Sequence, residues 1–122
     1  MNYNFKILNS TYRTINYINK LLVNYPKKEV ILKNNIERTC YEAVEFIFAY
    51  NINNTDRIRE KNLKDLVIKL SMLDFYMRVS FDKRLISSHQ YEVSGRFITE
   101  IRKMVYGLLR RRNEVKDRKS VV

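Results

Sequence analysis

The sequence predicts an all-α protein, an up-and-down antiparallel four-helix bundle, from three observations. Apolar residues recur at three- and four-residue steps over long stretches, the spacing that places side chains on one face of a helix. The 122 residues include only two glycines and one proline, too few for a sheet protein with many tight turns or for a glycine-rich phosphate loop. Hydrophobic residues make up 45% of the chain, as expected for one packed core. We expect one bundle over residues 1–112 and a charged, flexible tail over residues 113–122.

The first two helices are expected at about residues 6–25 and 27–50, separated by Pro26. Proline is tolerated in the first turn of a helix but not in its interior, so Pro26 ends one helix and suits the start of the next. The inward positions of the first helix are Leu8, Ile15, Ile18, Leu22 and Tyr25. Those of the second helix are Leu32, Ile36, Cys40, Ala43, Val44 and Ile47.

The third helix follows a polar connection at residues 51–56, in which Asn54 or Thr55 is the expected N-cap. The helix is expected to run to about Leu85. Its inner stripe is formed by Leu63, Leu66, Leu70, Leu73 and Met77.

A hinge then starts the fourth helix, which is expected at about residues 88–112. Ser87 and Gln90 have the spacing of a capping box, and Ile86 and Tyr91 have the N′ and N4 spacing of a hydrophobic staple. The inner side of this helix carries Phe97, Ile98, Ile101, Val105 and Leu108. An apolar scaffold therefore ends in three consecutive arginines.

The third helix carries a second apolar face, which we call the outer face. At about 100° per residue this face lies opposite the inner stripe, so burying one side leaves the other apolar. It consists of Ile68, Met72, Phe75 and Val79. Contiguous exposed patches of this kind usually mark a partner surface, so we interpret the outer face as an oligomer interface. The alternative is that Phe75 and its neighbours pack beneath a terminus or loop of the same chain.

Catalytic and metal chemistry have little support in the sequence. His89 is the only histidine, and no nucleophile is placed near it by a recognised spacing, so we interpret it as an exposed helix-start residue. Cys40 lies on an inner stripe, where a thiol behaves as a small hydrophobe. Glu42 and Glu45 have no histidine ligands nearby and are expected on a solvated face. We therefore expect no enzyme activity, no metal and no cofactor.

One possible ion pair is notable at the edge of the third helix. Asp74 and Arg78 are four residues apart, a spacing at which an exposed pair contributes a few tenths of a kcal/mol. Such a pair could be an interface contact or a salt bridge at the rim of the core, and we favour the rim salt bridge.

Charge gives the strongest argument for binding. Twenty-four basic and 13 acidic residues give a net charge of +11, which favours a polyanion, nucleic acid before a membrane surface. Arg96, Lys103 and Arg110 are seven residues apart and line up on the outward side of the fourth helix. Arg102, Arg111 and Arg112 broaden this line of cations. The alternative is that these cations only keep the helix soluble; the overall charge opposes this.

The longest apolar runs are much shorter than the roughly 20 residues that a membrane span needs. The first residues lack the charged-then-apolar order of a signal peptide, and Cys40 has no partner for a disulfide within the chain. A cytoplasmic protein without membrane contact is therefore expected.

Several segments together resemble the accessory variability determinant (Avd) family, small helical proteins encoded beside the reverse transcriptase of diversity-generating retroelements. The resemblance covers about residues 15–109. It is carried by the segments 25–28, 36–42, 73–78, 86–91 and 100–107, which read YPKK, IERTCYE, LDFYMR, ISSHQY and EIRKMVYG. The family pattern commonly has tryptophan after the glycine that corresponds to Gly107, whereas this chain has Leu108.

The resemblance implies a four-helix protomer that assembles into a ring-like homopentamer. It also implies binding to the reverse transcriptase and to template RNA, with DNA as a further nucleic-acid ligand, in support of mutagenic cDNA synthesis by the partner enzyme. The alternative is a structural four-helix oligomer related to the proteins encoded within ribosomal RNA intervening sequences, without a nucleic-acid function.

Overall fold

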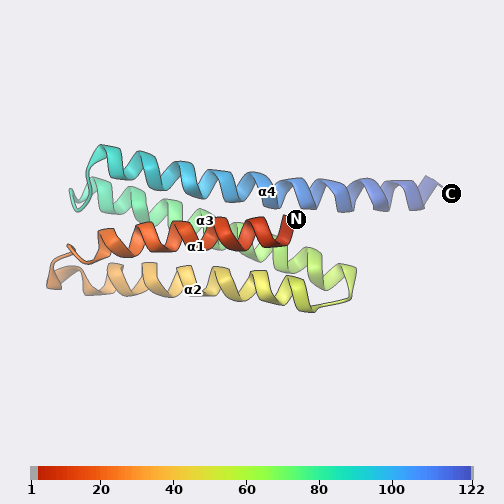
Figure 1. The fold of residues 1–122 in the computed structure, drawn as a ribbon, viewed down its shortest axis with the longest axis horizontal. Helices are drawn as coiled ribbons and strands as arrows, with labels where there is room; N and C mark the ends of the chain where they lie inside the picture. Colours follow the sequence, from red (N-terminus) through yellow and green to blue (C-terminus); the bar gives the residue numbers. More distant parts are fainter. Residues whose placement is uncertain (1–2, 122) are drawn as a thin grey trace.

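The protein is an up-and-down bundle of four antiparallel α-helices, as the sequence predicts (Figure 1). The computed structural model describes the backbone of residues 3–121 and the side chains of residues 5–112. The helices are α1 (Tyr3–Leu22), α2 (Val30–Ile52), α3 (Asp56–Asp82) and α4 (Ser88–Val121), with a 3₁₀ turn, η1 (Lys27–Glu29), before α2. Contacts run around the bundle from α1 to α2, α2 to α3, α3 to α4 and α4 back to α1.

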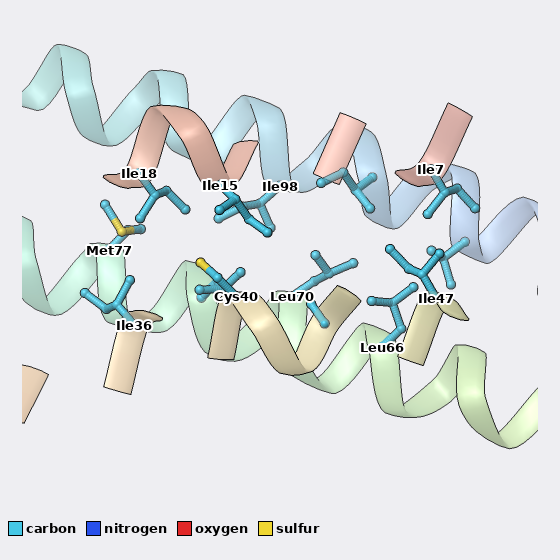
Figure 2. Close-up of a cluster of buried hydrophobic side chains, with 14 of the residues drawn as sticks. Ile7, Ile15, Ile18, Ile36, Cys40, Ile47, Leu66, Leu70, Met77 and Ile98 are labelled. Atoms are coloured by element: carbon cyan, nitrogen blue, oxygen red, sulfur yellow. The ribbon is translucent and has the colours of Figure 1, made fainter. Parts of the chain in front are cut away.

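Each predicted inner stripe faces the centre of the bundle. Figure 2 shows side chains from all four helices meeting there. The inner stripe of α3 is at most 1% exposed at each of its five positions. Ile98, Ile101 and Val105 of α4 are fully buried, while Phe97 and Leu108 at the stripe's edges are half-buried. Burial of these aliphatic side chains is the main source of stability, at roughly 25 cal/mol per Å² of apolar surface.

Three of the predicted helix ends need correction. α1 stops at Leu22, and residues 23–26 form the turn, although Tyr25 is buried as expected. α3 stops at Asp82 rather than near Leu85. α4 continues beyond Arg112 to Val121, so part of the segment expected to be a flexible tail is helical.

The turn between α3 and α4 explains why α3 ends early. Arg84 has φ = 62°, the only positive φ outside glycine among the described residues. The amide of Leu85 then donates to the carbonyl of Ser80 at 2.9 Å, a pattern that closes a helix C-terminus with a left-handed residue. Glycine usually fills that position, and arginine there gives no sequence signal.

The start of α4 forms the capping box that the sequence predicts. The amide of Gln90 donates to Ser87 Oγ at 3.1 Å, and the amide of Ser87 donates to Gln90 Oε1 at 2.9 Å. Ile86 is buried, as a staple residue should be. At the start of α3, Thr55 is the N-cap residue, but its side chain makes no capping hydrogen bond. No described helix combines the length and the apolarity needed to cross a membrane.

Candidate nucleic-acid interface

Three cations of α4, Arg96, Lys103 and Arg110, lie on its outward side, and we call them the α4 row. Arg96, Lys103 and Arg110 are all solvent-exposed, and their side chains lie opposite the buried stripe of α4. At 1.5 Å per residue, neighbours in this row are about 10.5 Å apart along the helix. Tyr106 is also exposed and lies one turn from both Lys103 and Arg110. This line of cations is suited to contact several phosphates along a polyanion.

The three cations expected to broaden the α4 row differ in their surroundings. Arg102 forms an ion pair with Asp74 at 3.3 Å, and its side chain is only 24% exposed. Arg112 pairs with Asp56 at 3.2 Å and is 16% exposed. Arg111 is exposed at the surface. Arg102 and Arg112 therefore connect α4 to α3, and much of their charge is already balanced.

These contacts correct the predicted ion pair within α3. Asp74 pairs with Arg102 of α4, and Arg78 pairs with Asp82 at 3.3 Å. A hydrogen bond involving the Tyr91 side chain, together with the charge of Asp82, raises the pKa of Arg78. The sequence prediction considered only Asp74, although Asp82 is also four residues from Arg78. Packing of α4 against α3 makes the choice.

The N-terminal half of α4 mixes both signs of charge. Glu92 and Glu100 lie four residues before and after Arg96, so both are its neighbours on the helix surface. An open groove beside them is lined by Asp74, Tyr91, Glu92, Gly95, Arg96, Thr99, Glu100 and Lys103. Acidic side chains at this spacing lower the local positive potential. The cationic part of the α4 row is therefore its C-terminal half.

The outer face of α3 is partly uncovered. Ile68 and Phe75 are each 57% exposed, and Met72 and Val79 are half-buried. The ring of Phe75 lies beside the neighbouring ring of Tyr76, at a centroid distance of 6.1 Å. No described terminus or loop covers Ile68 or Phe75, contrary to the alternative in which the chain buries its own outer face.

A second apolar line, on α2, was not anticipated from the sequence. Tyr41 is 57% exposed and Phe48 is 48% exposed. They are seven residues apart on one side of α2, with Glu37 and Glu45 one turn from Tyr41. An open groove there is lined by Asn34, Glu37, Arg38, Tyr41, Glu42 and Glu45. The spacing of seven between Tyr41 and Phe48 is the sequence signal that could have indicated this line.

His89, Cys40 and Glu42 lie in three separate places on the bundle. His89 is exposed in the first turn of α4. Cys40 is 1% exposed, and burial, with the nearby charge of Glu37, raises the pKa of its thiol to about 12. Glu42 was expected on a solvated face, but its carboxylate forms ion pairs with Lys69 at 3.5 Å and with Arg38 at 3.8 Å. Among the side chains that the structure describes, no three His, Cys, Asp or Glu residues converge as metal ligands would.

Comparison with known proteins agrees with this architecture. The family model described as bAvd-like matches residues 5–112, which span all four helices of the bundle. The chain belongs to the bAvd-like family. The match starts within α1 and ends at Arg112, so it includes the α4 row and the outer face of α3.

A solved structure shares the fold. It is a crystal structure of a protein of unknown function from the S23 ribosomal protein family of Bacteroides thetaiotaomicron VPI-5482. The two chains superpose with a TM-score of 0.80 at 14% sequence identity, covering 89% of this chain and 99% of the other. At that identity the likeness concerns the fold alone. No protein with curated annotation matches the sequence.

Proposed function

We propose that this bAvd-like protein is a non-enzymatic accessory subunit of a diversity-generating retroelement, which binds template RNA and the reverse transcriptase and supports mutagenic cDNA synthesis. The observation that carries the RNA part is the exposed α4 row, Arg96, Lys103 and Arg110, on a chain of net charge +11. The family membership supports the retroelement part.

The chemistry of the α4 row favours binding to the RNA backbone. Arginine can donate two hydrogen bonds at once to a phosphate, and lysine contributes a compact charge. Cations spaced along one helix face contact phosphates without reading base edges. Affinity should therefore depend weakly on RNA sequence and strongly on salt. If roughly six or more phosphates are neutralised by an assembly, affinity falls by orders of magnitude between about 50 and 200 mM salt.

The RNA part is tested by fluorescence anisotropy with labelled single-stranded RNAs of different sequence. We expect similar affinities for all of them, and we expect the change of Arg96, Lys103 and Arg110 to Glu to abolish binding. The matched control changes Lys27, Lys28 and Lys33 to Glu, because this alters the net charge equally at the start of α2. Helix content by circular dichroism and mass by light scattering should be unchanged in both variants.

Two outcomes would oppose the RNA part. Equal loss of binding in the control would mean that only net charge matters, and equal binding by the parent and the α4 variant would mean that the row is a solvated surface. A parent protein that forms oligomers but binds no RNA would favour the structural function that we consider as the alternative.

The enzyme-partner part is tested by cDNA synthesis. The proposal requires that a retroelement reverse transcriptase is encoded beside the gene, and that enzyme is assayed on its template RNA with and without this protein. We expect cDNA yield to depend on the parent protein and not to be restored by the α4 variant. Equal yield without the protein would oppose an accessory role.

Self-association completes the proposal, because a ring requires two different surfaces on each protomer. The outer face of α3 is one. The line of Tyr41 and Phe48 on α2 is the other, and its charges are complementary: Glu37 and Glu45 lie beside it, whereas the exposed Lys64 lies one turn from Ile68. We therefore expect the outer face of one copy to contact α2 of the next, in a closed head-to-tail assembly. The resemblance to the Avd family implies five copies in that ring.

A further inference from the structure

The outward side of α1 is a contiguous surface of aromatic, amide and basic side chains. Its five members are all exposed, and each lies three or four residues from another, so they are neighbours on the helix surface. We call this surface the α1 face; it consists of Asn9, Tyr12, Arg13, Asn16 and Lys20. The 20 residues of α1 include no Asp or Glu. At 1.5 Å per residue the α1 face is about 16 Å long.

The side chains of the α1 face take no part in holding the bundle together. Tyr12 is 66% exposed, the largest exposed fraction of any aromatic side chain that the structure describes. Arg13 and Lys20 form no ion pair with a described residue, and the amides of Asn9 and Asn16 form no hydrogen bond with one. Helices α2 and α3, by contrast, carry surface ion pairs between residues four apart. The ring, the amides and the cations of the α1 face are therefore all available to a ligand.

Helix stability and solubility do not account for the composition of the α1 face. Asparagine and tyrosine are weaker helix formers than the alanine, glutamate or lysine that suits a solvent-facing helix position. Because α1 has no carboxylate, Arg13 and Lys20 gain no ion pair along the helix. A face that only had to stay soluble would be served by interspersed charges of both signs. The residues of the α1 face are better explained by a ligand than by the fold.

The chemistry of the α1 face matches a single-stranded nucleic acid. At about 100° per residue, Tyr12 lies on one side of the two asparagines, and Arg13 and Lys20 lie on the other. An exposed ring stacks on any unpaired base, because every base has a π-face. The two cations suit the neighbouring phosphates, and asparagine amides both donate and accept hydrogen bonds, as base edges require. In a duplex the bases are already stacked and paired, so Tyr12 has no base to contact.

The α1 face is separate from the α4 row. Arg96 and Lys103 of that row line a groove with Asp74 of α3, so they lie toward the α3 side of α4. Helix α1 packs against another side of α4, where Tyr17 meets Phe97 edge-on with a distance of 5.6 Å between the ring centroids. Nucleotides bound at the α1 face are therefore not a direct continuation of a backbone that follows the α4 row.

We propose that the α1 face is a second RNA contact, which binds unpaired nucleotides by stacking a base on Tyr12 and by contacting the adjacent phosphates with Arg13 and Lys20. This inference rests on the proposed RNA binding and deepens it, because it adds a separate site and specifies single-stranded RNA. The α4 row needs only a phosphate backbone, whereas the α1 face also needs an exposed base.

The role of the ring is tested with Tyr12→Ala in the full-length protein. RNA affinity is measured by anisotropy over a range of salt concentrations, on a single-stranded RNA and on the duplex of the same sequence. Loss of one stacked base should weaken single-strand binding about 5- to 150-fold. The slope of log affinity against log salt should stay the same, because no phosphate contact is lost. Duplex affinity should not change, and Tyr12→Phe should bind both RNAs as the parent does.

The role of the cations is tested with the double variant Arg13→Gln, Lys20→Gln. If two phosphate contacts are lost, the salt slope should flatten by about 1.4 for single-stranded RNA. The matched control Lys27→Gln, Lys28→Gln removes the same charge from exposed positions in the turn before α2 and should leave the slope as in the parent. The charge-retaining exchange Arg13→Lys, Lys20→Arg should also bind as the parent does. Helix content by circular dichroism should be unchanged throughout, because every substituted side chain is exposed.

The outcomes separate this inference from the proposed function. If the parent binds RNA and the α1 variants bind it with the same affinity and salt slope, the inference fails while the α4 row remains a site. If the parent binds no RNA, both proposals fail. Equal weakening of single-strand and duplex binding by Tyr12→Ala would mean that no base is stacked and would overturn the inference. So would a smaller mass by light scattering for Tyr12→Ala, because Tyr12 would then belong to a contact between copies.

Discussion

Both faces of α3 are apolar in sequence, but the structure buries one of them completely and the other only in part. The inner stripe is at most 1% exposed at each position, whereas Ile68 and Phe75 on the outer face are 57% exposed. The hydrophobic effect favours burial of both faces to the same degree. Helices α2 and α4 cover only one of them. Periodicity thus predicts that a face needs a cover, and it does not say whether the cover comes from the same chain.

A charged substitution on the outer face should have the largest effect of all. It should reduce the particle mass measured in solution severalfold, because the oligomer dissociates. Phe75→Glu places a charge at the centre of the proposed contact and should dissociate the oligomer with helix content intact. Phe48→Glu should do the same from the α2 side. Light scattering at tens of micromolar measures both.

Mixing the two variants distinguishes a head-to-tail contact from a two-fold one. Each variant retains one intact surface, α2 in the first and α3 in the second, so an equimolar mixture should form a heterodimer and nothing larger. A mixture that stays monomeric would contradict pairing of α3 with α2. A parent protein that is strictly monomeric would remove the interface altogether.

Truncating a side chain of the inner stripe should destabilise the protomer more than a change on the outer face does, and should affect assembly less. Leu70→Ala should lower the free energy of unfolding by about 2–5 kcal/mol, because it leaves a cavity among fully buried side chains. Ile68→Ala, two residues earlier on the outer face, should change it by less than about 1 kcal/mol. Both are measured by urea unfolding in the Phe75→Glu background, where assembly does not contribute. Similar losses at the two positions would mean that the outer face is buried within the protomer.

The features of the fold that the sequence predicts are those that depend on neighbouring residues. The inner stripes and the capping box of Ser87 and Gln90 depend on residues within one or two turns, so their spacing is sufficient evidence. The end of α3 depends on Arg84 in a left-handed conformation, which few residue types signal. Local patterns were informative wherever the structure itself is locally determined.

The same holds for the candidate site: features that depend on spacing along one helix could be predicted, and features that depend on packing between helices could not. Exposure of the α4 row follows from spacing alone. Neutralisation of Arg102 by Asp74, 28 residues away, depends on how α4 packs against α3, and spacing cannot reveal it.

Removing the N-cap of α4 should lower the free energy of unfolding less than creating a cavity in the core does. Ser87→Ala should lower the free energy of unfolding by about 1 kcal/mol, because the amide of Gln90 loses its acceptor at the start of α4. Ser88→Ala is the matched control, since Ser88 lies next to the cap and makes no part of the box. Thermal or urea unfolding measures both. A larger loss of unfolding free energy for Ser88→Ala than for Ser87→Ala would mean that Ser88, and not Ser87, is the N-cap of α4.

The smallest effect is expected at the edge of α3, between its two faces. Asp74→Asn removes the ion pair with Arg102, whose members are 35% and 24% exposed, so the pair is screened by solvent. The loss should be below about 1 kcal/mol and should shrink further as salt rises. Asp82→Asn, which breaks the more exposed pair with Arg78, should cost less still.

Asp74→Asn should also change RNA binding, which an unfolding measurement does not detect. With Asp74 neutral, the charge of Arg102 is no longer balanced beside the α4 row, and the local positive potential rises. RNA affinity measured by anisotropy should therefore increase for Asp74→Asn, most clearly at low salt, and stay unchanged for Asp82→Asn. A loss of affinity in Asp74→Asn would mean that the ion pair positions Arg102 for binding. A large loss of stability would mean that the pair sets the register of α4 on α3.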